Sequence, residues 1–566
     1  MKVVVIGGVA GGASAAARVR RLDEKAEIVM FERGLDISYS NCALPYYLGG
    51  SVESAEKLIL STPEKFRGEF SIDVRTRSEV TAIHRETKTV SVKNLETGET
   101  YEESYDKLVL SPGAAPIMPK SIQGIDRENA FSVRNVQDIV RIKTYLDAHD
   151  ARDIVVVGGG FIGIEVAENL KAAGKNVAVV EGLGQILAPF DTDLVQILQK
   201  ELYDQGVGLY LNTTLTAIED GRAVCTKDGE TFSLPADAVI LAIGVAPETK
   251  LAAEAGLAIG QTRGIKVNKH MQTDDPDIYA VGDAVETVNA LTGQPGRLAL
   301  AGPAQWQART AANHICGRDD SYKGFIGSSC IRVFGMNAAS TGLNEKAAAA
   351  AGLNFDSVNV YPFDKVKIMP DASPLAFKLV YSVPDGRILG AQAVGKGDAT
   401  KRVDIIAALI HMGGTVYDLL GVEHCYAPLF STAKDIVHMA ALTAANLLEG
   451  SFRQVHVKDV RGLAESGAFI LDVRDAREYE LSHVKGAKNV PLGELRARLD
   501  EIPKDVPVYV HCRTSQRSYY ACRCLQGHGF DNVINISGSF LGICLYEYYG
   551  DKTTGREPIV TGYNFD

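Results

Sequence analysis

Two segments of the chain repeat one pattern: an apolar run, a glycine-rich turn, a stretch with helical periodicity and a second apolar run. The first segment covers residues 2 to 33, and the second covers residues 154 to 181. Short runs rich in β-branched residues, such as those at the start of each segment, predict buried strands. The pattern therefore predicts two βαβ units and an α/β fold class built on Rossmann-like domains.

The first glycine turn predicts a dinucleotide site. The backbone N–H groups of a strand–glycine–helix turn bind a pyrophosphate, and an acid at the end of the second strand accepts hydrogen bonds from ribose hydroxyls. The residues assigned to this site are Gly7, Ala10, Gly12, Glu32 and Arg33. Because the middle glycine of the GxGxxG pattern is replaced by a valine at position 9, the motif is only moderately specific.

The second glycine turn matches the same pattern fully, with Gly158, Gly160 and Gly163. Glu181 closes the following apolar run, at the ribose position. A carboxylate there repels a 2′-phosphate, so we expect NADH as the preferred cofactor, with NADPH as the alternative. Two matches in βαβ context on one chain make a structural coincidence improbable.

The second half of the chain has a different pattern. Strands are expected over residues 328–334, 377–381 and 388–394, and helices over residues 402–412 and 432–448. This order is typical of an α+β domain, and the helix from Thr432 could contribute to a partner surface. A boundary is expected near residues 449–451, and a further domain begins at Phe452.

Composition and charge narrow the class of protein. The 566 residues predict three to five domains, and a net charge of -11 argues against a nucleic-acid partner. The first residues leave no room for a signal peptide, and no apolar run of about 18 residues predicts membrane insertion. Nine cysteines, an odd number, favour reduced thiols and a cytoplasmic location. Packing is the favoured interpretation for Cys225, Cys316, Cys330 and Cys425.

One cysteine stands out as a candidate for chemistry. Cys42 lies in a polar, aromatic stretch from Ser38 to Tyr47 that reads as a loop, or as a helix starting at Pro45. Such a turn can expose a thiol and lower its pKa. The alternative is a buried cysteine that acts as a small apolar residue.

Two further motifs carry a family resemblance. A short apolar strand ends in Gly282-Asp283 at an expected helix start, and Ala114 lies in the stretch 111–116. Here the chain resembles the flavoproteins with two dinucleotide-binding domains, in which the matching aspartate binds the ribityl chain of FAD. An N-cap role for Asp283 is compatible with this. The resemblance implies an FAD domain (residues 1–115 and 240–320), an NAD(H) domain (116–239) and a dimerisation domain (321–448).

The last segment, residues 452–566, resembles a rhodanese domain in its stretches 470–491 and 508–518. A strand leads into Cys512, and four residues separate it from Arg517, the short loop that the resemblance associates with sulfur transfer rather than with phosphate. A cysteine in such a loop faces backbone N–H groups and a helix dipole, which favour a thiolate. We interpret Cys522, Cys524 and Cys544 as structural, because a Cys-x-Cys pair is too little for a metal site.

The surroundings of Cys42 distinguish among flavoprotein reductases. The positions four to six residues after it are Tyr46, Tyr47 and Leu48, so it has no neighbouring cysteine for an intramolecular disulfide. Its oxidised form must be a mixed disulfide, a persulfide or a sulfenic acid. Ala10 stands where the peroxidase branch carries a histidine. The motif around Cys42 resembles that of coenzyme A disulfide reductases, and the whole chain resembles their fusions with rhodanese, including NADH-dependent persulfide reductases of the pyridine nucleotide-disulfide oxidoreductase superfamily.

This resemblance implies a homodimer in which Tyr426 of the partner subunit approaches the active sulfur. A second family tyrosine is absent, because the matching stretch reads Ile368-Met369, and this favours persulfide or polysulfide over a stable disulfide. Ser38, Asn41 and Arg21 match positions near the coenzyme A channel, with coenzyme A a substrate or a tightly bound group. The expected activity is NADH-dependent reduction of these small thiol compounds at Cys42, with Cys512 relaying sulfane sulfur. The alternatives are an NADH oxidase or peroxidase with a Cys42 sulfenic acid, and a coenzyme A-binding redox sensor or sulfur carrier.

Overall fold

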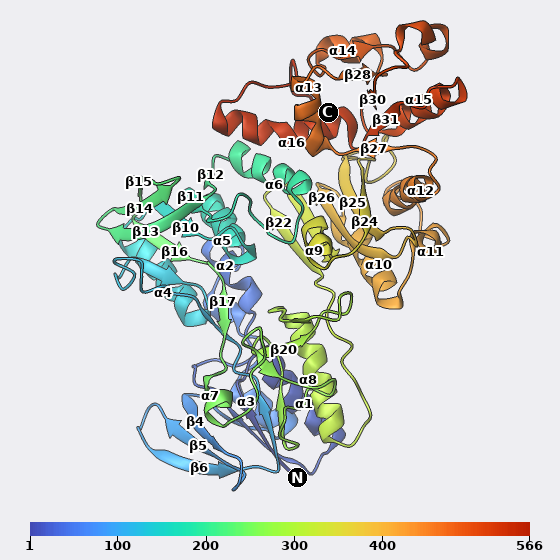
Figure 1. Cartoon of the computed structure of the whole chain (residues 1–566). Helices are drawn as coiled ribbons and strands as arrows, with labels where there is room; N and C mark the ends of the chain where they lie inside the picture. Colours follow the sequence, from blue (N-terminus) through green and yellow to red (C-terminus); the bar gives the residue numbers. More distant parts are fainter. Residues whose placement is uncertain (566) are drawn as a thin grey trace. The chain divides into compact units, whose positions relative to one another are not determined.

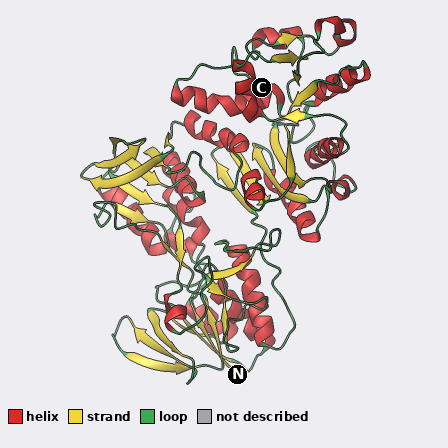
Figure 2. Cartoon of the chain, viewed as in Figure 1, coloured by secondary structure: helices red, strands yellow, loops and turns green. Residues whose placement is uncertain are grey.

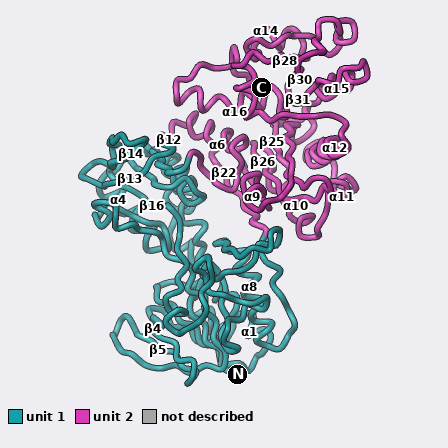
Figure 3. Tube along the Cα trace, in the orientation of Figure 1, with its two compact units in different colours: residues 1–183, 210–325 teal, residues 184–209, 326–566 magenta. Residues whose placement is uncertain are grey.

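The computed structural model describes residues 1–565, in which helices are interspersed with runs of consecutive strands (Figures 1 and 2). The chain forms two compact units (Figure 3). The first comprises residues 1–183 and 210–325, and the second comprises residues 184–209 and the chain from Ile326 onward. No helix among the described residues combines the length and the apolar character needed to cross a bilayer.

The first βαβ unit belongs to a five-stranded parallel sheet with the order β19-β7-β1-β2-β3. Its strands are β1 (Lys2–Ile6), β2 (Glu27–Phe31), β3 (Asp73–Arg75), β7 (Lys107–Leu110) and β19 (Ile278–Ala280). Alternate residues of β1 enter different cores: Val3 and Val5 pack with helices α1 (Ala10–Leu22) and α8 (Ala301–Ile315), whereas Val4 and Ile6 pack on the other face. Because both faces are covered, the strand is apolar throughout, and this explains the continuous run in the sequence.

The second βαβ unit lies in another five-stranded sheet of the first unit, with the order β12-β11-β10-β16-β9. Its strands are β9 (Ala130–Ser132), β10 (Asp153–Val157), β11 (Asn176–Val180), β12 (Gly208–Tyr210) and β16 (Ala238–Leu241). Strand β10 pairs in parallel with β11 and β16, and helix α5 (Phe161–Ala172) follows it. Each βαβ domain also carries a three-stranded antiparallel sheet: β4 (Ser78–His84), β5 (Thr89–Asn94) and β6 (Thr100–Ser104) in the first, and β13 (Thr213–Glu219), β14 (Arg222–Lys227) and β15 (Glu230–Pro235) in the second. Strands β8 (Ala114–Pro116) and β17 (Val245–Pro247) pair antiparallel between the two domains.

The second unit contains an antiparallel sheet with the order β22-β23-β26-β25-β24. Its strands are β22 (Ser329–Val333), β23 (Met336–Gly342), β24 (Phe355–Val360), β25 (Leu375–Ser382) and β26 (Ile388–Gly395), and its longer helices are α10 (Ala399–Met412) and α12 (Ile436–Leu448). The expected elements are present with small shifts. The last helix begins at Ile436 rather than at Thr432, because the Asp435 side chain accepts a hydrogen bond from the Val437 N–H and caps it there.

The rhodanese-like segment forms a parallel sheet with the order β27-β31-β30-β28-β29. Its strands are β27 (Gln454–Val455), β28 (Phe469–Asp472), β29 (Lys488–Asn489), β30 (Val508–His511) and β31 (Val533–Ile536), and its helices are α13 (Val460–Glu465), α14 (Ala476–Leu481), α15 (Gln516–Gly527) and α16 (Ser539–Thr554). Within the second unit, α16 packs on α6 (Thr192–Asp204), where Tyr548 Oη donates to Asp204 Oδ1 at 3.2 Å.

A buried charge cluster holds α6 to the antiparallel sheet. The ammonium of Lys378 on β25 lies 3.1 Å from Asp191, 3.0 Å from Asp193 and 2.8 Å from Glu345. Lys378 is only 1% exposed, so these carboxylates supply the solvation that water provides elsewhere. The cluster fixes the segment that carries α6 within the second unit.

Candidate functional site

The first glycine turn is built so that only glycine fits at two positions. Gly7 has a φ of +95°, and a Cβ there would lie 2.1 Å from the carbonyl oxygen of Ser111. A Cβ on Gly12 would lie 1.8 Å from the carbonyl oxygen of Gly7. These contacts bring α1 against β1 and point its N-terminus, which starts at Ala10, at the turn.

The carboxylate of Glu32 braces this turn. It accepts hydrogen bonds from the N–H of Gly8 at 2.8 Å and from the N–H of Gly34 at 2.7 Å. Gly7, Glu32 and Arg33 line one cavity of 330 Å³. Arg33 forms an ion pair with Glu248 there. The cavity adjoins the helix N-terminus, as a dinucleotide site requires.

Asp283 lies in a turn that leads into a strand, so the expected helix start is wrong. The turn passes directly into β20 (Val285–Val288), whose Val285 pairs with Ile265 of β18 (Ile265–Lys266), and this pairing keeps the backbone extended. An N-cap role is therefore excluded. Burial raises the pKa of the Asp283 carboxyl, although Arg134 and Arg297 oppose the shift.

The Nε atom of Arg297, near Asp283, is buried and has no hydrogen-bond partner among the described residues. Buried polar groups in proteins are almost always hydrogen-bonded, so an orphaned donor here indicates a missing ligand group. Ala114, in β8, follows Gly113, whose φ is +75° and whose Cβ position lies 2.7 Å from the Arg134 guanidinium. The residues present fit a bound flavin dinucleotide.

The second glycine turn repeats the construction of the first. Gly158 has a φ of +110°, and a Cβ on Gly163 would lie 1.9 Å from the carbonyl oxygen of Gly158. A Cβ on Gly160 would meet no atom within 4 Å, so packing does not demand this glycine and the space above it is open for a ligand. Glu181 accepts from the N–H of Gly159 at 2.6 Å and from that of Leu183 at 2.7 Å.

Cys42 lies in a single 3-10 turn, Asn41–Ala43, which continues into helix α2 (Leu44–Leu48) with Pro45 in its first turn. The alternative of a helix beginning around the proline is therefore confirmed. The residue is exposed, as expected of a reactive thiol. However, burial of the sulfur and the carboxylates of Glu165 and Asp283 raise the pKa of Cys42. The expected lowering of its pKa by the turn is wrong for the protein chain alone, because tertiary neighbours outweigh the local turn.

Glu165 is a neighbour of Cys42 that the sequence did not single out. It lies on α5, two residues after Gly163, and α5 packs against α2. Burial, with a smaller effect from Glu168, raises the pKa of Glu165 to about 7. The sequence did contain a signal for Glu165, because an acidic residue stands between Ile164 and Val166, which are both buried. Positions within a buried helix are usually apolar.

The predicted coenzyme A residues lie on two elements. The backbone of Ser38, with a φ of +48°, donates to the carbonyl oxygen of Gly8 at 2.9 Å, and Asn41 is exposed beside Cys42. Arg21 is exposed on α1, near Arg18. Burial and the cations Arg309, Arg318 and Arg21 lower the pKa of Arg18, which indicates a concentration of positive charge.

This group of four, which we call the arginine cluster, comprises Arg18, Arg21, Arg309 and Arg318. The helices that contribute most of it, α1 and α8, pack side by side (Figure 1). Arg18 Nε donates to Asn313 Oδ1 at 3.0 Å, which fixes it. Arg309 and Arg318 lie almost 300 residues from Arg21, so the sequence concealed the cluster.

Tyr426 lies in the second unit, in an exposed segment that precedes α12. Its side chain is 51% exposed, and Leu429 and Phe430 nearby are also exposed. The segment is anchored by Arg402, which donates to the carbonyl oxygen of Phe430 and forms a buried ion pair with Asp435 at 3.2 Å. An exposed apolar surface with a rigid base is typical of a subunit interface.

Cys512 follows β30 directly and is only 1% exposed. Ser515, with a φ of +74°, turns the loop into α15. Arg517 donates to both oxygens of Glu478 on α14, at 2.6 and 2.8 Å, so its charge is balanced by a carboxylate that the sequence did not reveal. The hydroxyl of Ser539, at the start of α16, lies 3.9 Å from Cys512 Sγ.

The other cysteines divide by burial. Cys522, Cys524 and Cys544 are buried in the cores of the rhodanese-like segment, as expected of structural residues, and Cys225 is also buried. Cys316 is partly buried. Cys330 and Cys425 are exposed, so the packing interpretation is wrong for them within one subunit. None of the nine forms a disulfide, as expected.

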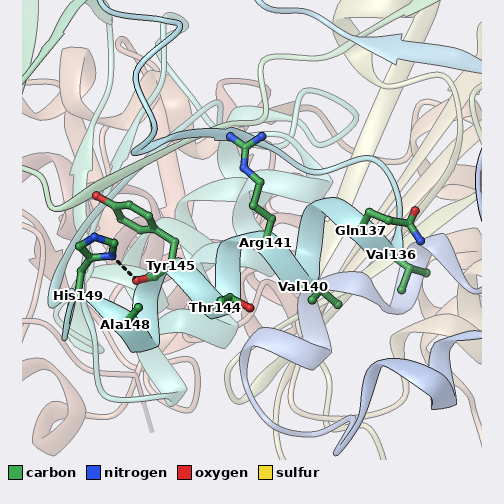
Figure 4. A pocket seen from close by; sticks show the side chains of 8 residues that line it. All are labelled: Val136, Gln137, Val140, Arg141, Thr144, Tyr145, Ala148 and His149. Carbon is green, nitrogen blue, oxygen red and sulfur yellow. Dashed lines mark hydrogen bonds between the residues drawn. The ribbon is translucent and has the colours of Figure 1, made fainter.

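An apolar groove lies along helix α4 (Val136–Ala148), in the domain with the second glycine turn (Figure 4). Its lining residues are Val136, Gln137, Val140, Arg141, Thr144, Tyr145, Ala148 and His149. The rings of Tyr145 and His149 stack at 4.1 Å at one end. No predicted site residue lines this groove.

The chain matches known family models over most of its length. Residues 1–308 match the pyridine nucleotide-disulphide oxidoreductase model, residues 329–436 match the dimerisation domain of that family, and residues 456–545 match the rhodanese-like domain. The chain therefore belongs to the pyridine nucleotide-disulphide oxidoreductase family and carries a rhodanese-like domain. Membership implies FAD and a nicotinamide dinucleotide as cofactors. The predicted fold class and family resemblance are confirmed.

Individual relatives narrow the comparison. The chain is 34% identical to coenzyme A disulfide reductase of Staphylococcus aureus over 78% of its own length and 99% of the relative's. Its structure is similar to that of reduced CoADR-RHD of Bacillus anthracis, with 42% identity, a TM-score of 0.93 and coverage of 97% and 98% of the two chains. It is also similar to a NAD-dependent persulfide reductase from A. fulgidus, with 35% identity, a TM-score of 0.89 and coverage of 95% and 99%.

Proposed function

We propose that this protein is an FAD-dependent NADH reductase of persulfides, polysulfides or coenzyme A disulfide, with a rhodanese domain that relays sulfane sulfur. The observation that carries the proposal is the pairing of two cysteines on one chain. Cys42 lies in a flavoprotein fold with no second cysteine in its turn, and Cys512 lies in a four-residue rhodanese loop. A single thiol must take its sulfur partner from outside, and a rhodanese loop handles such sulfur.

Two dinucleotides complete the reductase. FAD, when bound, accepts electrons from NADH and supplies them to the sulfur on Cys42. The residues assigned to FAD are Gly7, Ala10, Gly12, Glu32, Arg33, Ala114 and Asp283, and those assigned to NADH are Gly158, Gly160, Gly163 and Glu181. The strained glycines, the unpartnered Arg297 donor and the open space above Gly160 support these assignments.

The chemistry at Cys42 begins with its thiolate attacking a substrate S–S bond. That bond breaks, a bond between Cys42 and the transferred sulfur forms, and a thiol or sulfide leaves. Two electrons then cleave the bond between Cys42 and the transferred sulfur, which leaves as sulfide or as a thiolate, and the thiolate of Cys42 is restored. Because Glu165 and Asp283 oppose ionisation of Cys42 in the protein chain, the thiolate needs a stabilising partner in the complete enzyme. Tyr426 of the partner subunit is assigned to protonate or hydrogen-bond the leaving sulfur.

Coenzyme A is proposed as the carrier of the substrate sulfur. Its phosphates need cations, and the arginine cluster offers four guanidinium groups with no carboxylate among the groups that act on Arg18. Ser38 and Asn41, beside Cys42, are assigned to the end of the molecule that carries sulfur. We place the domain boundaries at residues 1–115 with 240–320, 116–239, 321–448 and 452–566, and propose a homodimer closed by the third of these domains. Nine cysteines, an odd number, support a reducing compartment such as the cytoplasm.

Two substitutions test the proposal. Cys42→Ser abolishes NADH-dependent sulfide release from coenzyme A persulfide, because no thiolate remains to attack. Cys512→Ser spares reduction of this small substrate but slows turnover of sulfane-sulfur donors such as thiosulfate. Sulfide release by Cys42→Ser, or equal loss of both activities in Cys512→Ser, would contradict the division of labour.

The alternative functions give different results in the same experiments. An oxidase or peroxidase consumes NADH with oxygen or peroxide at a rate similar to that with persulfide. A coenzyme A-binding sensor or sulfur carrier is reduced slowly or not at all by NADH. Mass spectrometry of the purified protein, for bound coenzyme A and for persulfide on Cys42 or Cys512, identifies the physiological sulfur state directly.

A further inference from the structure

Ser539, the first residue of α16, has an unusual backbone conformation. Its φ is +50°, and it follows Gly538, whose φ is +81°. Residues other than glycine rarely adopt positive φ, and such conformations persist only where the surroundings fix them, often at functional sites. Ser539 is fully buried, so its hydroxyl must find partners within the domain.

Those partners belong to the Cys512 loop. The Ser539 oxygen accepts a hydrogen bond from the Cys512 N–H at 3.1 Å and lies 3.9 Å from Cys512 Sγ, with its proton able to point at the sulfur. Its other acceptor is the carbonyl oxygen of Ile536, at 3.3 Å. The single proton of Ser539 therefore has competing acceptors: the neutral oxygens of Ile536 and Ser518, the latter 3.4 Å away, and Cys512 Sγ, which can become charged.

Two neighbouring serines are satisfied elsewhere. Ser515 Oγ donates to the carbonyl oxygen of Ile536 at 3.1 Å, and Ser518 Oγ donates to Asn535 Oδ1 at 2.6 Å. Ser515 Oγ can also donate to Ser539 Oγ at 3.2 Å, and Ser518 Oγ lies 3.4 Å from Ser539 Oγ, where either hydroxyl can donate. The cluster holds the Ser539 oxygen in place while its proton stays free to turn.

We propose that Ser539 is a catalytic residue of sulfur transfer at Cys512, whose hydroxyl proton turns from the Ile536 carbonyl to Sγ when Cys512 becomes a thiolate. The assignment rests on the proposed role of Cys512 as a sulfur relay. A hydrogen bond to an ionised acceptor is stronger than one to a neutral carbonyl, so the charge on Sγ decides where the proton points.

The step that benefits is release of sulfur from the Cys512 persulfide. An acceptor thiolate attacks the outer sulfur, and a new S–S bond forms between them. The bond between the outer sulfur and Sγ breaks, and its electron pair stays on Sγ as a thiolate. The Ser539 hydrogen bond is stronger to this leaving thiolate than to the persulfide, which is how an interaction accelerates a step.

Two substitutions separate the hydroxyl from the backbone. Ser539→Gly and Ser539→Ala both remove the hydroxyl, but only glycine accepts a φ of +50° without strain. Ser537→Ala is the matched control, because Ser537 is also buried, accepts from the Asn359 N–H at 3.4 Å and makes no hydrogen bond with Cys512. The charged group that acts on Cys512, Arg517 with its partner Glu478, is unchanged in all three variants.

The measurement is the rate of Cys512 alkylation against pH in the holoenzyme, read from the Cys512 peptide by mass spectrometry. In both Ser539 variants, we expect the half-maximal pH to rise by about one unit, which leaves about tenfold less thiolate at neutral pH. Sulfur transfer from thiosulfate to cyanide should slow by about the same factor. Ser537→Ala should match the wild type, and Ser539→Gly should unfold at a higher temperature than Ser539→Ala, because both lose the oxygen that accepts from the Cys512 N–H and only alanine keeps the backbone strain.

An unchanged half-maximal pH of Cys512 alkylation in both Ser539 variants would overturn the proposal. A shift of this pH in Ser539→Ala alone would also overturn it, because the effect would then come from the backbone rather than from the hydroxyl. The test uses neither NADH nor Cys42. If the wild type released no sulfide from persulfides while the Cys512 profile shifted in both variants, the reductase function would fail and the role of Ser539 would stand.

Discussion

The guanidinium of Arg517 donates to both carboxylate oxygens of Glu478, at 2.6 and 2.8 Å. This bidentate pair joins the first turn of α15 to α14, and it balances Arg517, one of two arginines in the segment from Cys512 to Arg517. Bidentate arginine–carboxylate pairs are geometrically specific, so the pair both orients Arg517 and reduces its attraction for an anionic sulfur donor.

Removing Glu478 should therefore strengthen the binding of anionic donors. We expect Glu478→Gln to lower the KM for thiosulfate by about three- to tenfold, the effect of one unmasked charge at a partly exposed site. Steady-state transfer to cyanide measures this. Glu480→Gln removes an exposed carboxylate from the same helix and should leave KM unchanged. A higher KM in Glu478→Gln would mean that the pair is needed to hold Arg517 in place.

The reactivity of Cys42 should depend on the charge of Glu165. Because the pKa of Glu165 is raised to about 7, its carboxyl is neutral below that pH and negative above it. The negative form opposes ionisation of Cys42, so Glu165→Gln should react faster than the wild type only above pH 7. Alkylation of Cys42 in the holoenzyme between pH 6 and 9, read by mass spectrometry, measures the difference.

Glu168→Gln is the second variant: the Glu168 charge raises the pKa of Glu165, so its removal should lower that pKa and slow alkylation of Cys42 at pH values just below 7. Equal rates for Glu165→Gln and the wild type at all pH values would show that the flavin, rather than Glu165, controls the thiol.

The buried charge cluster around Lys378 should make stability depend on acid. Burial opposes ionisation of Glu345, but the attraction and hydrogen bonds of Lys378 outweigh it and lower the pKa of Glu345 to about 2. A lowered pKa stabilises the folded state at pH values above the ordinary pKa of glutamate, and this stabilisation is lost as the pH falls from about 4.5 to about 2. Its size is about 3 kcal/mol, from the shift in pKa.

We expect the free energy of unfolding of Glu345→Gln at pH 7 to be about 3 kcal/mol lower than that of the wild type. Between pH 5 and pH 3, the free energy of unfolding should fall less in the variant than in the wild type. Urea denaturation of the holoenzyme measures both. Lys458→Ala removes an exposed partner of the same carboxylate, 3.3 Å away, and should cost less than about 1 kcal/mol. Parallel acid profiles for Glu345→Gln and the wild type would contradict the assignment.

Glu181 should set the preference for NADH. Its carboxylate holds the second glycine turn through the N–H groups of Gly159 and Leu183, and in the proposed assignment it faces the ribose and repels a 2′-phosphate. Glu181→Ala should raise the KM for NADH. It should also lower the ratio of kcat/KM for NADH to kcat/KM for NADPH by about tenfold, because one charge repulsion against the 2′-phosphate is removed. Steady-state kinetics with both cofactors decides this. A raised KM for both cofactors with an unchanged ratio would limit Glu181 to bracing the turn.

Local signals explain which features could be predicted. The two βαβ units and the α+β domain follow from local strand, helix and glycine patterns, whereas the rhodanese-like domain follows from the resemblance of two short stretches; the structure confirms these elements with shifts of a few residues. The helix expected after Asp283 failed because pairing with β18, a contact between separate segments, keeps the chain extended. Strand pairing overrides local preference in this way because its hydrogen bonds come from elsewhere.

The sequence by itself determined the two βαβ units, because their contiguous residues have a spacing with a direct geometric meaning. Its motifs also carried the resemblance to the family, and that resemblance indicated Cys42 and Cys512 as candidates. The tertiary structure alone decided the environment of each thiol. Glu165 raises the pKa of Cys42, Glu478 balances Arg517, Ser539 reaches Cys512, and Arg309 and Arg318 join Arg21, in every case across sequence separations of 27 residues or more. Electrostatic and hydrogen-bond interactions depend on distance in space, and only the folded chain sets that distance.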